Sequence, residues 1–290
     1  MTVELLFDTK CKLGEGPIWD HTRNLFYWVD ILDQKLYRYG ARDNKVEVVA
    51  FDRAIGCVVP RESGGVVVAL QDGFHFYDWE LGRLEPITDP ESHLQDNRFN
   101  DGKCDPAGRF WAGTTDSVGV DGHGALYMLD TSLKVSKKIK NVGTSNGLVW
   151  SPDATAMYFI DTPTRQVVRY TYELESGMIS DPEVGVEFPE GSGLPDGMTI
   201  DEEGMLWIAH WGGHGVSRWD PTSGKQLDFI QVPAVNVTSC TFGGAEMNEL
   251  YITTARTRTS EAELEQYPHA GGVFRVQTGV KGSYNERFGG

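Results

Sequence analysis

The sequence predicts an all-β fold, a six-bladed β-propeller with four-stranded blades, that occupies residues 1–290 as a single domain. Three observations support this prediction. Short runs rich in aromatic and β-branched residues alternate with Gly, Asp, Asn and Pro, as strands alternate with turns. Helix signals are nearly absent. A sequence unit also recurs at intervals of about 40 to 50 residues, the spacing typical of propeller blades.

The repeated unit opens with a dipeptide whose second residue is usually glycine. An apolar strand, a turn such as D-x-x-G and a second apolar strand follow. The six dipeptides are Glu15-Gly16, Ile55-Gly56, Asp101-Gly102, Asn146-Gly147, Asp196-Gly197 and, in a weaker copy, Ser239-Cys240. A single blade cannot bury both faces of its sheet, so the units must stack around an axis. Two packed sandwiches are the alternative architecture, and the regular period over the whole chain favours the propeller.

Each unit continues into a third predicted strand, and four of the units carry a Trp or Phe at a matching position of the second strand. The third strands are expected at residues 35–39, 73–77, 125–129, 167–170, 216–219 and 272–276. We expect the aromatic residues to pack in the core between blades; they are Trp28, Trp111, Phe159 and Trp207. The one convincing helix, residues 260–266, starts with a serine cap and an acidic first turn.

Composition and missing motifs exclude several classes of function. The chain carries 42 acidic and 26 basic residues, a formal net charge of −16, which disfavours binding to nucleic acid or to anionic membranes. The sequence contains no GxSxG, HExxH or P-loop motif and no GxGxxG followed by a helix. Serine-hydrolase, zincin and nucleotide-binding functions therefore lose their usual support.

Cysteine usage and hydropathy indicate the compartment. The cysteines lie far apart without CxxC spacing, so we expect reduced, mostly buried thiols; they are Cys11, Cys57, Cys104 and Cys240. The N-terminus does not resemble a signal peptide, and no segment approaches the roughly 18 apolar residues of a membrane span. We expect a cytoplasmic protein. Because a closed propeller needs no partner, we also expect a monomer.

The first residues of the repeated dipeptides are predicted to line the central channel. Several of them carry oxygen atoms suited to a hard cation, namely Glu15, Asp101, Asn146 and Asp196. Like charges at such a point repel one another unless a cation compensates them. An isolated D-G or N-G dipeptide usually marks only a turn. Here the polar residue keeps the same repeat phase in four units and precedes a strand, which favours a site for one divalent metal.

Two polar clusters are predicted near the channel mouth. Arg98 and Asn100 lie just before the third unit, where a guanidinium and an amide could bind hydroxyl groups or a carbonyl oxygen; a solvated surface loop is the alternative. His210 and Trp211 follow the fifth unit, where Trp211 could stack on a sugar ring. A packed Trp beside an exposed His is the slightly favoured interpretation. Asp161, at the end of a second strand, is expected to be structural.

Five motifs occur in order between about residues 13 and 276. They are LGEGPIWD (13–20), RFNDGKCDPAGRFWAGT (98–114), SNGLVWSPD (145–153), PDGMTIDEEGMLW (195–207) and GGVF (271–274). Together they strongly resemble the motifs of the senescence-marker-protein-30/gluconolactonase/luciferin-regenerating-enzyme family, and among its members those of bacterial sugar lactonases. The resemblance implies a six-bladed propeller with a single central metal.

The resemblance also implies roles for five residues of this chain. Glu15, Asn146 and Asp196 would hold the metal, Arg98 and Asn100 would bind the substrate, and Asp196 would serve as general base. This leaves Asp101 as a neighbour of the metal site. The metal is expected to be Ca²⁺, with Fe²⁺, Zn²⁺, Mn²⁺ and Mg²⁺ as alternatives.

The implied activity is hydrolysis of a small-molecule sugar lactone, such as arabinono-, xylono- or gluconolactone, to the aldonic acid. This would be a metal-dependent carboxylic-ester hydrolase of carbohydrate metabolism. A related esterase or phosphotriesterase-type propeller hydrolase and a non-catalytic sugar-binding propeller are the alternatives. Mammalian family members carry an acidic lid residue after the third-blade GT. This chain has the shorter TTDSVGVDGHG (114–124) there, in which Asp116 could substitute.

Overall fold

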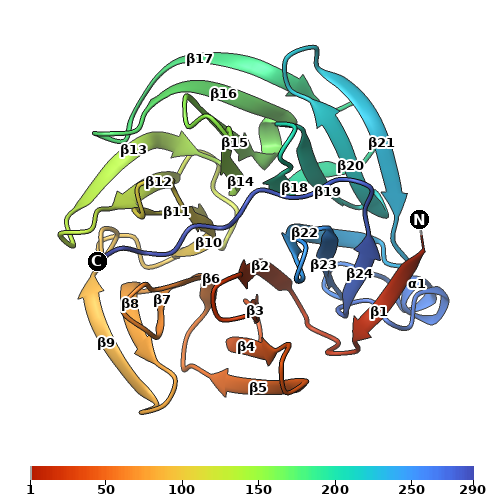
Figure 1. Cartoon of the computed structure of the whole chain (residues 1–290), viewed down its shortest axis with the longest axis horizontal. Coiled ribbons are helices and arrows are strands. Elements are labelled where there is room, and N and C mark those ends of the chain that lie inside the picture. The colour runs from red at the N-terminus through yellow and green to blue at the C-terminus, as the bar shows by residue number, and fades with distance from the viewer. Residues whose placement is uncertain (1) are drawn as a thin grey trace.

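The computed structural model describes residues 2–290 and contains six four-stranded sheets arranged around a central axis (Figure 1). Neighbouring strands pair antiparallel, and in five of the blades the strands follow chain order outward from the axis. The structure therefore confirms the all-β, six-bladed propeller. Five of the predicted third strands lie within the third strand of their blade, and the sixth, predicted at 272–276, begins one residue before β24.

The first three blades occupy the first half of the chain. Blade one contains β2 (Gly14–Asp20), β3 (Leu25–Asp30), β4 (Lys35–Gly40) and β5 (Lys45–Ala50). Blade two contains β6 (Ile55–Pro60), β7 (Val66–Leu70), β8 (Gly73–Asp78) and β9 (Arg83–Thr88). Blade three contains β10 (Asn97–Cys104), β11 (Phe110–Asp116), β12 (Gly124–Leu129) and β13 (Val135–Val142).

The remaining blades complete the ring. Blade four contains β14 (Ser145–Trp150), β15 (Ala156–Asp161), the 3₁₀ turn η1 (Thr162–Thr164), β16 (Gln166–Glu173) and β17 (Met178–Glu187). Blade five contains β18 (Leu194–Ile200), β19 (Leu206–Trp211), β20 (Gly215–Asp220) and β21 (Lys225–Gln231). Blade six contains β22 (Asn236–Gly243), β23 (Glu249–Ala255), the helix α1 (Glu261–Gln266) and β24 (Val273–Gln277).

The N-terminal strand β1 (Val3–Phe7) closes the ring by becoming the outer strand of blade six. Val3 pairs with Val276 of β24 at the opposite end of the chain. The first and last strands of the propeller thus lie in one sheet, and unfolding either end exposes the edge of the other.

The innermost strand of every blade has a register shift next to the repeated dipeptide. Such bulges bend a strand and re-aim a side chain. The glycines that follow allow the innermost strands to approach each other. A Cβ atom at Gly147 would lie 2.8 Å from the backbone nitrogen of Met198 on the next blade. The D-G and N-G dipeptides at 101–102, 146–147 and 196–197 thus lie within strands and do not form turns.

Large apolar side chains fill the space between blades. The predicted aromatic core residues are at most 3% exposed; they are Trp28, Trp111, Phe159 and Trp207. All four cysteines are free and buried, as predicted. The predicted helix is α1, which Ser260 caps with a reciprocal capping box to Glu263.

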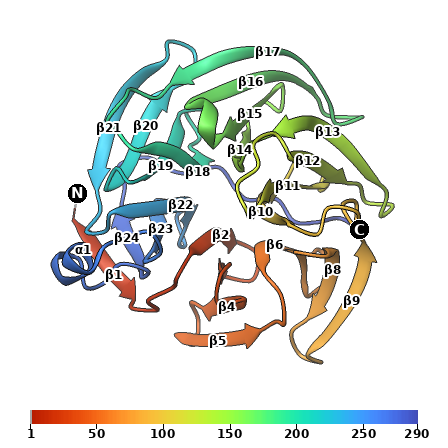
Figure 2. The ribbon, with the colours of Figure 1, turned by 180° about the vertical axis from the view of Figure 1, so that it is seen from behind.

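The C-terminal segment crosses one face of the ring (Figure 1), and in the opposite view it passes behind the innermost strands (Figure 2). Its backbone donates from Gly282 to Met247 of blade six and from Phe288 to Pro60 of blade two. The side chain of Phe288 is fully buried. This face of the ring is therefore tied together across several blades. Within residues 2–290, no helix has the length and apolar character needed to cross a membrane.

Candidate metal centre

The strand register corrects the predicted repeat phase of blade three. In blades three, four and five, the last paired residues before the register shift are Phe99, Ser145 and Pro195. The residues that follow are Asn100, Asn146 and Asp196. Asn100, and not Asp101, thus occupies the position equivalent to Asn146 and Asp196, whereas Glu15 is itself the last paired residue before the shift in blade one. Sequence alignment on the D-G dipeptide was wrong by one residue because both Asn100 and Asp101 are polar.

The three predicted ligands lie together at the centre of the ring. Glu15 of β2, Asn146 of β14 and Asp196 of β18 are each at most 5% exposed. The side chains of Glu15 and Asn146 both lie within hydrogen-bonding reach of Asp196. The Glu15 carboxylate also accepts from the N–H of Gly16 at 3.0 Å. Two carboxylates and one side-chain amide from three different blades therefore converge.

Burial and mutual repulsion dominate the electrostatics of this centre. Burial, followed by the charges of Asp196 and Asp101, raises the pKa of Glu15 well above its ordinary value. Burial and Asp101 likewise raise the pKa of Asp196 well above its ordinary value. Burial raises the pKa of Asp101, and the Lys103 ammonium partly offsets this change. The centre therefore concentrates more negative charge than its own surroundings compensate.

A divalent cation fits this donor set. Carboxylate and amide oxygens are ligands of hard cations, and a bound cation would remove the repulsion that raises the pKa of both acids. Within residues 2–290, no group of three or more His, Cys, Asp and Glu side chains is arranged to hold a metal ion. The amide of Asn146 is therefore essential to the set, since it supplies the third donor. The metal site itself remains a prediction.

The two predicted substrate-binding residues lie beside this centre. Nη1 of Arg98 donates to Oδ1 of Asn100 at 2.7 Å, and Nδ2 of Asn100 donates to Oδ1 of Asn146 at 3.2 Å. Burial lowers the pKa of Arg98 to about 10, while Glu15 and Asp196 act in the opposite direction. Arg98 is thus the guanidinium that faces the acidic centre. The structure brings all five predicted site residues together in one cluster.

Other predicted candidates are occupied by contacts within the protein. Nδ1 of His210 lies 2.7 Å from the carbonyl of Ser192, and Nε2 lies 2.5 Å from Oγ of Ser217, so both ring nitrogens are used. The favoured interpretation of a packed Trp beside an exposed His was wrong, because His210 is buried and Trp211 is partly exposed at the end of β19. The Asp161 carboxylate accepts from the N–H groups of Gly143 and Thr144, in agreement with its predicted structural role.

Asp116, the candidate lid residue, is held by its own loop. Its Oδ1 accepts from the N–H groups of Val118 and Gly119 at 2.8 and 2.9 Å, and its Oδ2 lies 3.1 Å from Nδ1 of His123. These contacts order the start of the loop between β11 and β12. A substrate role for Asp116 remains untested.

Sequence reasoning gave no role to two residues that contact the centre's strands. Nζ of Lys103 crosses from β10 to donate to the carbonyl of Met198 on β18 at 3.0 Å. The hydroxyl of Thr162, in η1, lies 2.8 Å from Nδ2 of Asn146. Lys103 belongs to the third-blade motif (98–114) and lies two residues after Asp101 in the same strand. This spacing could have indicated that the two side chains are close to each other. No pattern in the sequence marks Thr162.

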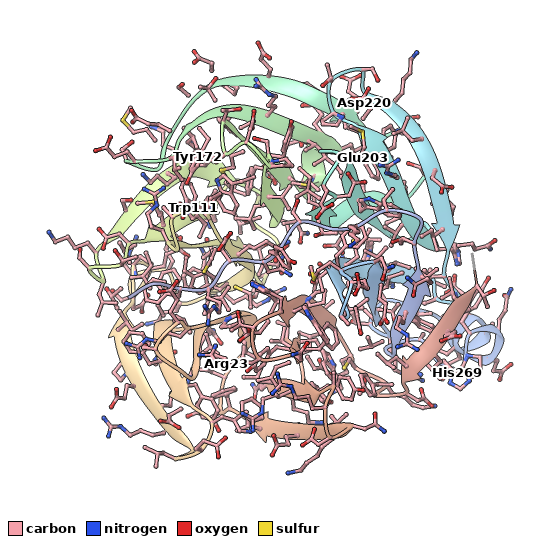
Figure 3. The ribbon with its side chains drawn as sticks, in the orientation of Figure 1. Arg23, Trp111, Tyr172, Glu203, Asp220 and His269 are labelled. Carbon is pink, nitrogen blue, oxygen red and sulfur yellow. The ribbon has the colours of Figure 1, made fainter. Side chains whose placement is uncertain are left out.

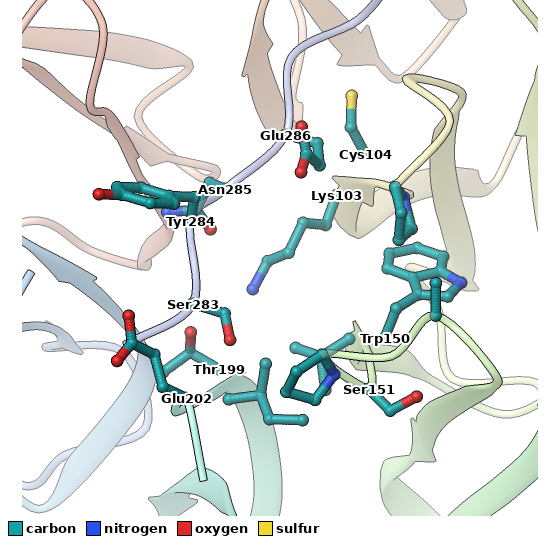
Figure 4. Close-up of a pocket in the computed structure, with 15 residues that line it drawn as sticks. Lys103, Cys104, Trp150, Ser151, Thr199, Glu202, Ser283, Tyr284, Asn285 and Glu286 are labelled. Atoms are coloured by element: carbon teal, nitrogen blue, oxygen red, sulfur yellow. The ribbon is translucent and has the colours of Figure 1, made fainter. Parts of the chain in front are cut away.

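A cavity of about 280 Å³ lies at the other end of the innermost strands (Figure 4). It is lined by Lys103 near the end of β10, by Trp150 and by the C-terminal residues Ser283 and Glu286. Arg98 and Asn100 lie near the start of β10, so the candidate centre faces the opposite end of the ring. The Lys103 side chain extends into the cavity from the β10 side (Figure 4).

Comparison with known proteins identifies the family. Residues 13–256 match the family model described as the SMP-30/Gluconolactonase/LRE-like region. A putative sugar lactone lactonase, YvrE, of Bacillus subtilis is 42% identical over 277 residues, which cover 96% of this chain and 95% of the relative. Human regucalcin is 37% identical over 286 residues, which cover 97% and 96%.

The solved structure of regucalcin from Agrobacterium tumefaciens, described as a calcium-binding protein, superposes with a TM-score of 0.94. It is 28% identical and covers 99% of this chain and 97% of its own. These matches agree with the sequence motifs and with the six blades. The chain belongs to the SMP-30/gluconolactonase/LRE-like family.

Proposed function

We propose that this chain is a metal-dependent sugar lactonase, which opens an aldonolactone to the aldonic acid. It uses one divalent cation, for which Ca²⁺ is the first candidate. The observation that carries the proposal is the meeting of Glu15, Asn146 and Asp196 at the axis, with Arg98 and Asn100 beside them. A relative with 42% identity bears a lactonase name, and a close structural neighbour is described as calcium-binding. These names support both parts of the proposal.

Glu15, Asn146 and Asp196 would hold the cation through their oxygen atoms. When bound, the cation supplies Lewis-acid polarisation of the lactone carbonyl. Asp196, a buried carboxylate at this centre, takes the proton of the attacking water. The proton then passes to the ring oxygen as the ester bond breaks, so the product is an open-chain hydroxy acid.

Arg98 and Asn100 orient the substrate in this proposal. The bond from Arg98 to Asn100 fixes the Asn100 amide, and the remaining N–H donors of the guanidinium are directed to the ring hydroxyls or the carbonyl oxygen. Orientation of this kind brings the carbonyl carbon to the attacking water in a reactive pose. The aldonate product is an anion in a protein of net charge −16, which does not favour its retention.

The decisive experiment is a pH-drop assay on chelated enzyme that is re-supplied with single metals. The substrates are arabinono-, xylono- and gluconolactone, together with a phosphotriester and an aryl ester. Chelator-sensitive hydrolysis of the lactones, restored by one metal, is the expected result. Preferential phosphotriester or aryl-ester hydrolysis would replace the lactonase proposal with the related hydrolase. Absence of any activity and of bound metal would favour a non-catalytic sugar-binding propeller.

Elemental analysis tests the ligand set separately. Glu15→Gln removes a charge but keeps the size of the side chain, so the variant is expected to fold and to lose most of its bound metal. Glu203→Gln is the matched control, because Glu203 is 63% exposed and pairs with Arg218 on the surface. Unchanged metal content in Glu15→Gln would remove Glu15 from the ligand set.

The free, buried thiols also agree with a reducing compartment, and we propose a monomeric enzyme of the cytoplasm.

A further inference from the structure

We infer that Thr162 is a positioning residue of this centre: its hydroxyl orients the Asn146 amide and links it to the strand that carries Asp196. The inference rests on the proposed function for the presence of a cation at the centre. Thr162 is partly buried in η1, at the start of the segment between β15 and β16. It belongs to none of the motifs that indicated the site.

A continuous chain of side-chain hydrogen bonds runs through the centre and ends at Thr162. Nη1 of Arg98 donates to Oδ1 of Asn100 at 2.7 Å, and Nδ2 of Asn100 reaches Oδ1 of Asn146 at 3.2 Å. Nδ2 of Asn146 then reaches Oγ1 of Thr162 at 2.8 Å. Oγ1 of Thr162 reaches the carbonyl oxygen of Pro195 at 2.9 Å. The chain therefore connects blades three, four and five.

The end groups of this hydrogen-bond chain, the Arg98 guanidinium and the Pro195 carbonyl, determine which atom donates in every bond between them. A guanidinium can only donate, and a backbone carbonyl can only accept. The carbonyl of Pro195 thus requires the single O–H of Thr162, so the Thr162 oxygen must accept from its other neighbour. That neighbour is the Asn146 side chain, which must present its NH₂ group to Thr162. The carbonyl of Pro195 thus fixes the direction of the Thr162 hydroxyl. That hydroxyl in turn fixes which end of the Asn146 amide carries the oxygen.

This direction matters because only the oxygen of an amide binds a hard cation. With Nδ2 held by Thr162, Oδ1 of Asn146 accepts one bond from Asn100 and keeps a second lone pair for the cation. The rotated amide would exchange the places of its oxygen and its NH₂ group, and the oxygen would then face Thr162 instead of the cation. Partners that orient ligands in this way are typically worth a 10- to 100-fold change in metal affinity.

Thr162 also couples two ligands on different blades. Its acceptor, Pro195, immediately precedes Asp196 in β18, while its donor, Asn146, lies in β14. One hydroxyl therefore sets the separation of the two innermost strands beside both ligands. Its own position does not depend on the side chain, because the N–H of Thr162 donates to the carbonyl of Thr144 and its carbonyl accepts from Arg165.

The test compares three substitutions by calorimetric titration of the chelated, full-length protein with CaCl₂. Thr162→Val keeps the shape of the side chain and removes the hydroxyl, and its calcium affinity is expected to fall about 10- to 100-fold. Thr162→Ser keeps the hydroxyl and is expected to restore an affinity within a few-fold of wild type. Thr164→Val is the matched control from the same turn, since the Thr164 hydroxyl bonds to the carbonyl of Asp161, outside the ligand set.

Two further readouts separate orientation from general damage. Thermal unfolding of the chelated variants should show Thr162→Val and Thr164→Val to be similarly folded. At saturating calcium, lactone turnover by Thr162→Val should recover most of the wild-type rate, because the cation then holds the amide in place. A loss of turnover that calcium does not correct would contradict a positioning role.

The outcomes distinguish this inference from the proposed function. Wild-type affinity in Thr162→Val, or an equal loss in Thr164→Val, would overturn the role of Thr162 and leave the lactonase proposal intact. Failure of Thr162→Ser to rescue calcium binding would also overturn it. A wild-type protein that binds no divalent cation would overturn the metal-dependent function, and with it the reason for orienting the amide.

Discussion

Two groups of buried carboxylates in this propeller have opposite surroundings. Asp105, at the turn between β10 and β11, is fully buried. It accepts hydrogen bonds from Nε of Arg109 at 2.6 Å, Nε1 of Trp111 at 2.8 Å and the hydroxyl of Tyr172 at 2.9 Å. The backbone N–H groups of residues 107 and 109 also bond to it. Trp111 and Tyr172 lie near each other in blades three and four (Figure 3).

The carboxylates at the axis have weaker compensation. Glu15 accepts one backbone N–H and faces Arg98, but its neighbours Asp196 and Asp101 are themselves acids. Every buried acid carries a desolvation cost. At Asp105 the fold offsets that cost with a cation and neutral donors. At Glu15 and Asp196 the contacts with Arg98, Asn146 and backbone N–H groups leave the pKa of both acids raised, which is the usual property of groups held ready for a ligand or for proton transfer. The contrast distinguishes a structural acid from a functional one.

The largest expected effect comes from Asp196→Asn. This change removes the base and weakens one ligand, so lactone turnover should fall by at least about 10²- to 10⁴-fold. Unfolding of the chelated variant should show no loss of stability, because the substitution removes repulsion among buried acids. Turnover and thermal unfolding are measured on the same samples. Normal lactonase activity would rule out Asp196 as the base.

Asp105→Ala should lower stability and leave the metal centre unaffected, the reverse of the result expected for Asp196→Asn. It leaves the buried guanidinium of Arg109 without its counter-ion, which typically costs about 3–5 kcal/mol of stability. Urea unfolding should reveal this loss, while the calcium affinity of the folded fraction stays close to that of wild type. A variant of wild-type stability would show that the hydrogen-bond network around Asp105 is dispensable.

The pH dependence of stability provides a smaller effect. The pKa values of Glu15 and Asp196 are raised in the folded, metal-free protein, so the folded state binds more protons than the unfolded state above the ordinary carboxylate pKa. Stability of the chelated protein should therefore fall as pH rises above the ordinary carboxylate pKa values and through the raised pKa values of these two acids.

Calcium should reverse this trend, since the ligands bind it in their deprotonated form. Urea unfolding at several pH values, with chelator and with calcium, measures both effects. Glu15→Gln supplies the control, because it removes one of the titrating groups. Stability of the chelated protein that rises with pH over this range would contradict the picture of uncompensated acids at the axis.

The smallest effect is expected at the exposed end of a similar network. Arg218 contacts both the buried Asp201 and the exposed Glu203, whose position at the rim is visible in Figure 3. Glu203→Gln should change stability by less than about 1 kcal/mol, because solvent screens this pair. Thermal unfolding measures this change in stability. A loss of stability as large as that of Asp105→Ala would show that the exposure of an ion pair does not predict its contribution to stability here.

The repeat in the sequence predicted six blades, the positions of the third strands and four oxygen-bearing residues near one axis, and the family resemblance narrowed these to three. The predictions of blades and strands succeeded because the hydrophobic pattern and the glycines repeat together, and only radial stacking satisfies both. The phase of blade three was wrong because Asn100 and Asp101 both precede Gly102 and are both polar. The pairing of Phe99 with Thr114 decides between them, and a pairing is not visible in one strand's sequence.

The sequence by itself determined the propeller, the family and the residue types that gather at its centre, since all of these follow from local pattern and repeat phase. The tertiary structure alone decided which acids lie beside other acids, that β1 closes blade six, and that Thr162 touches Asn146 and Pro195. Those contacts join residues from separate blades or from opposite ends of the chain. Their hydrogen-bond directions depend on geometry that exists only after the ring has closed.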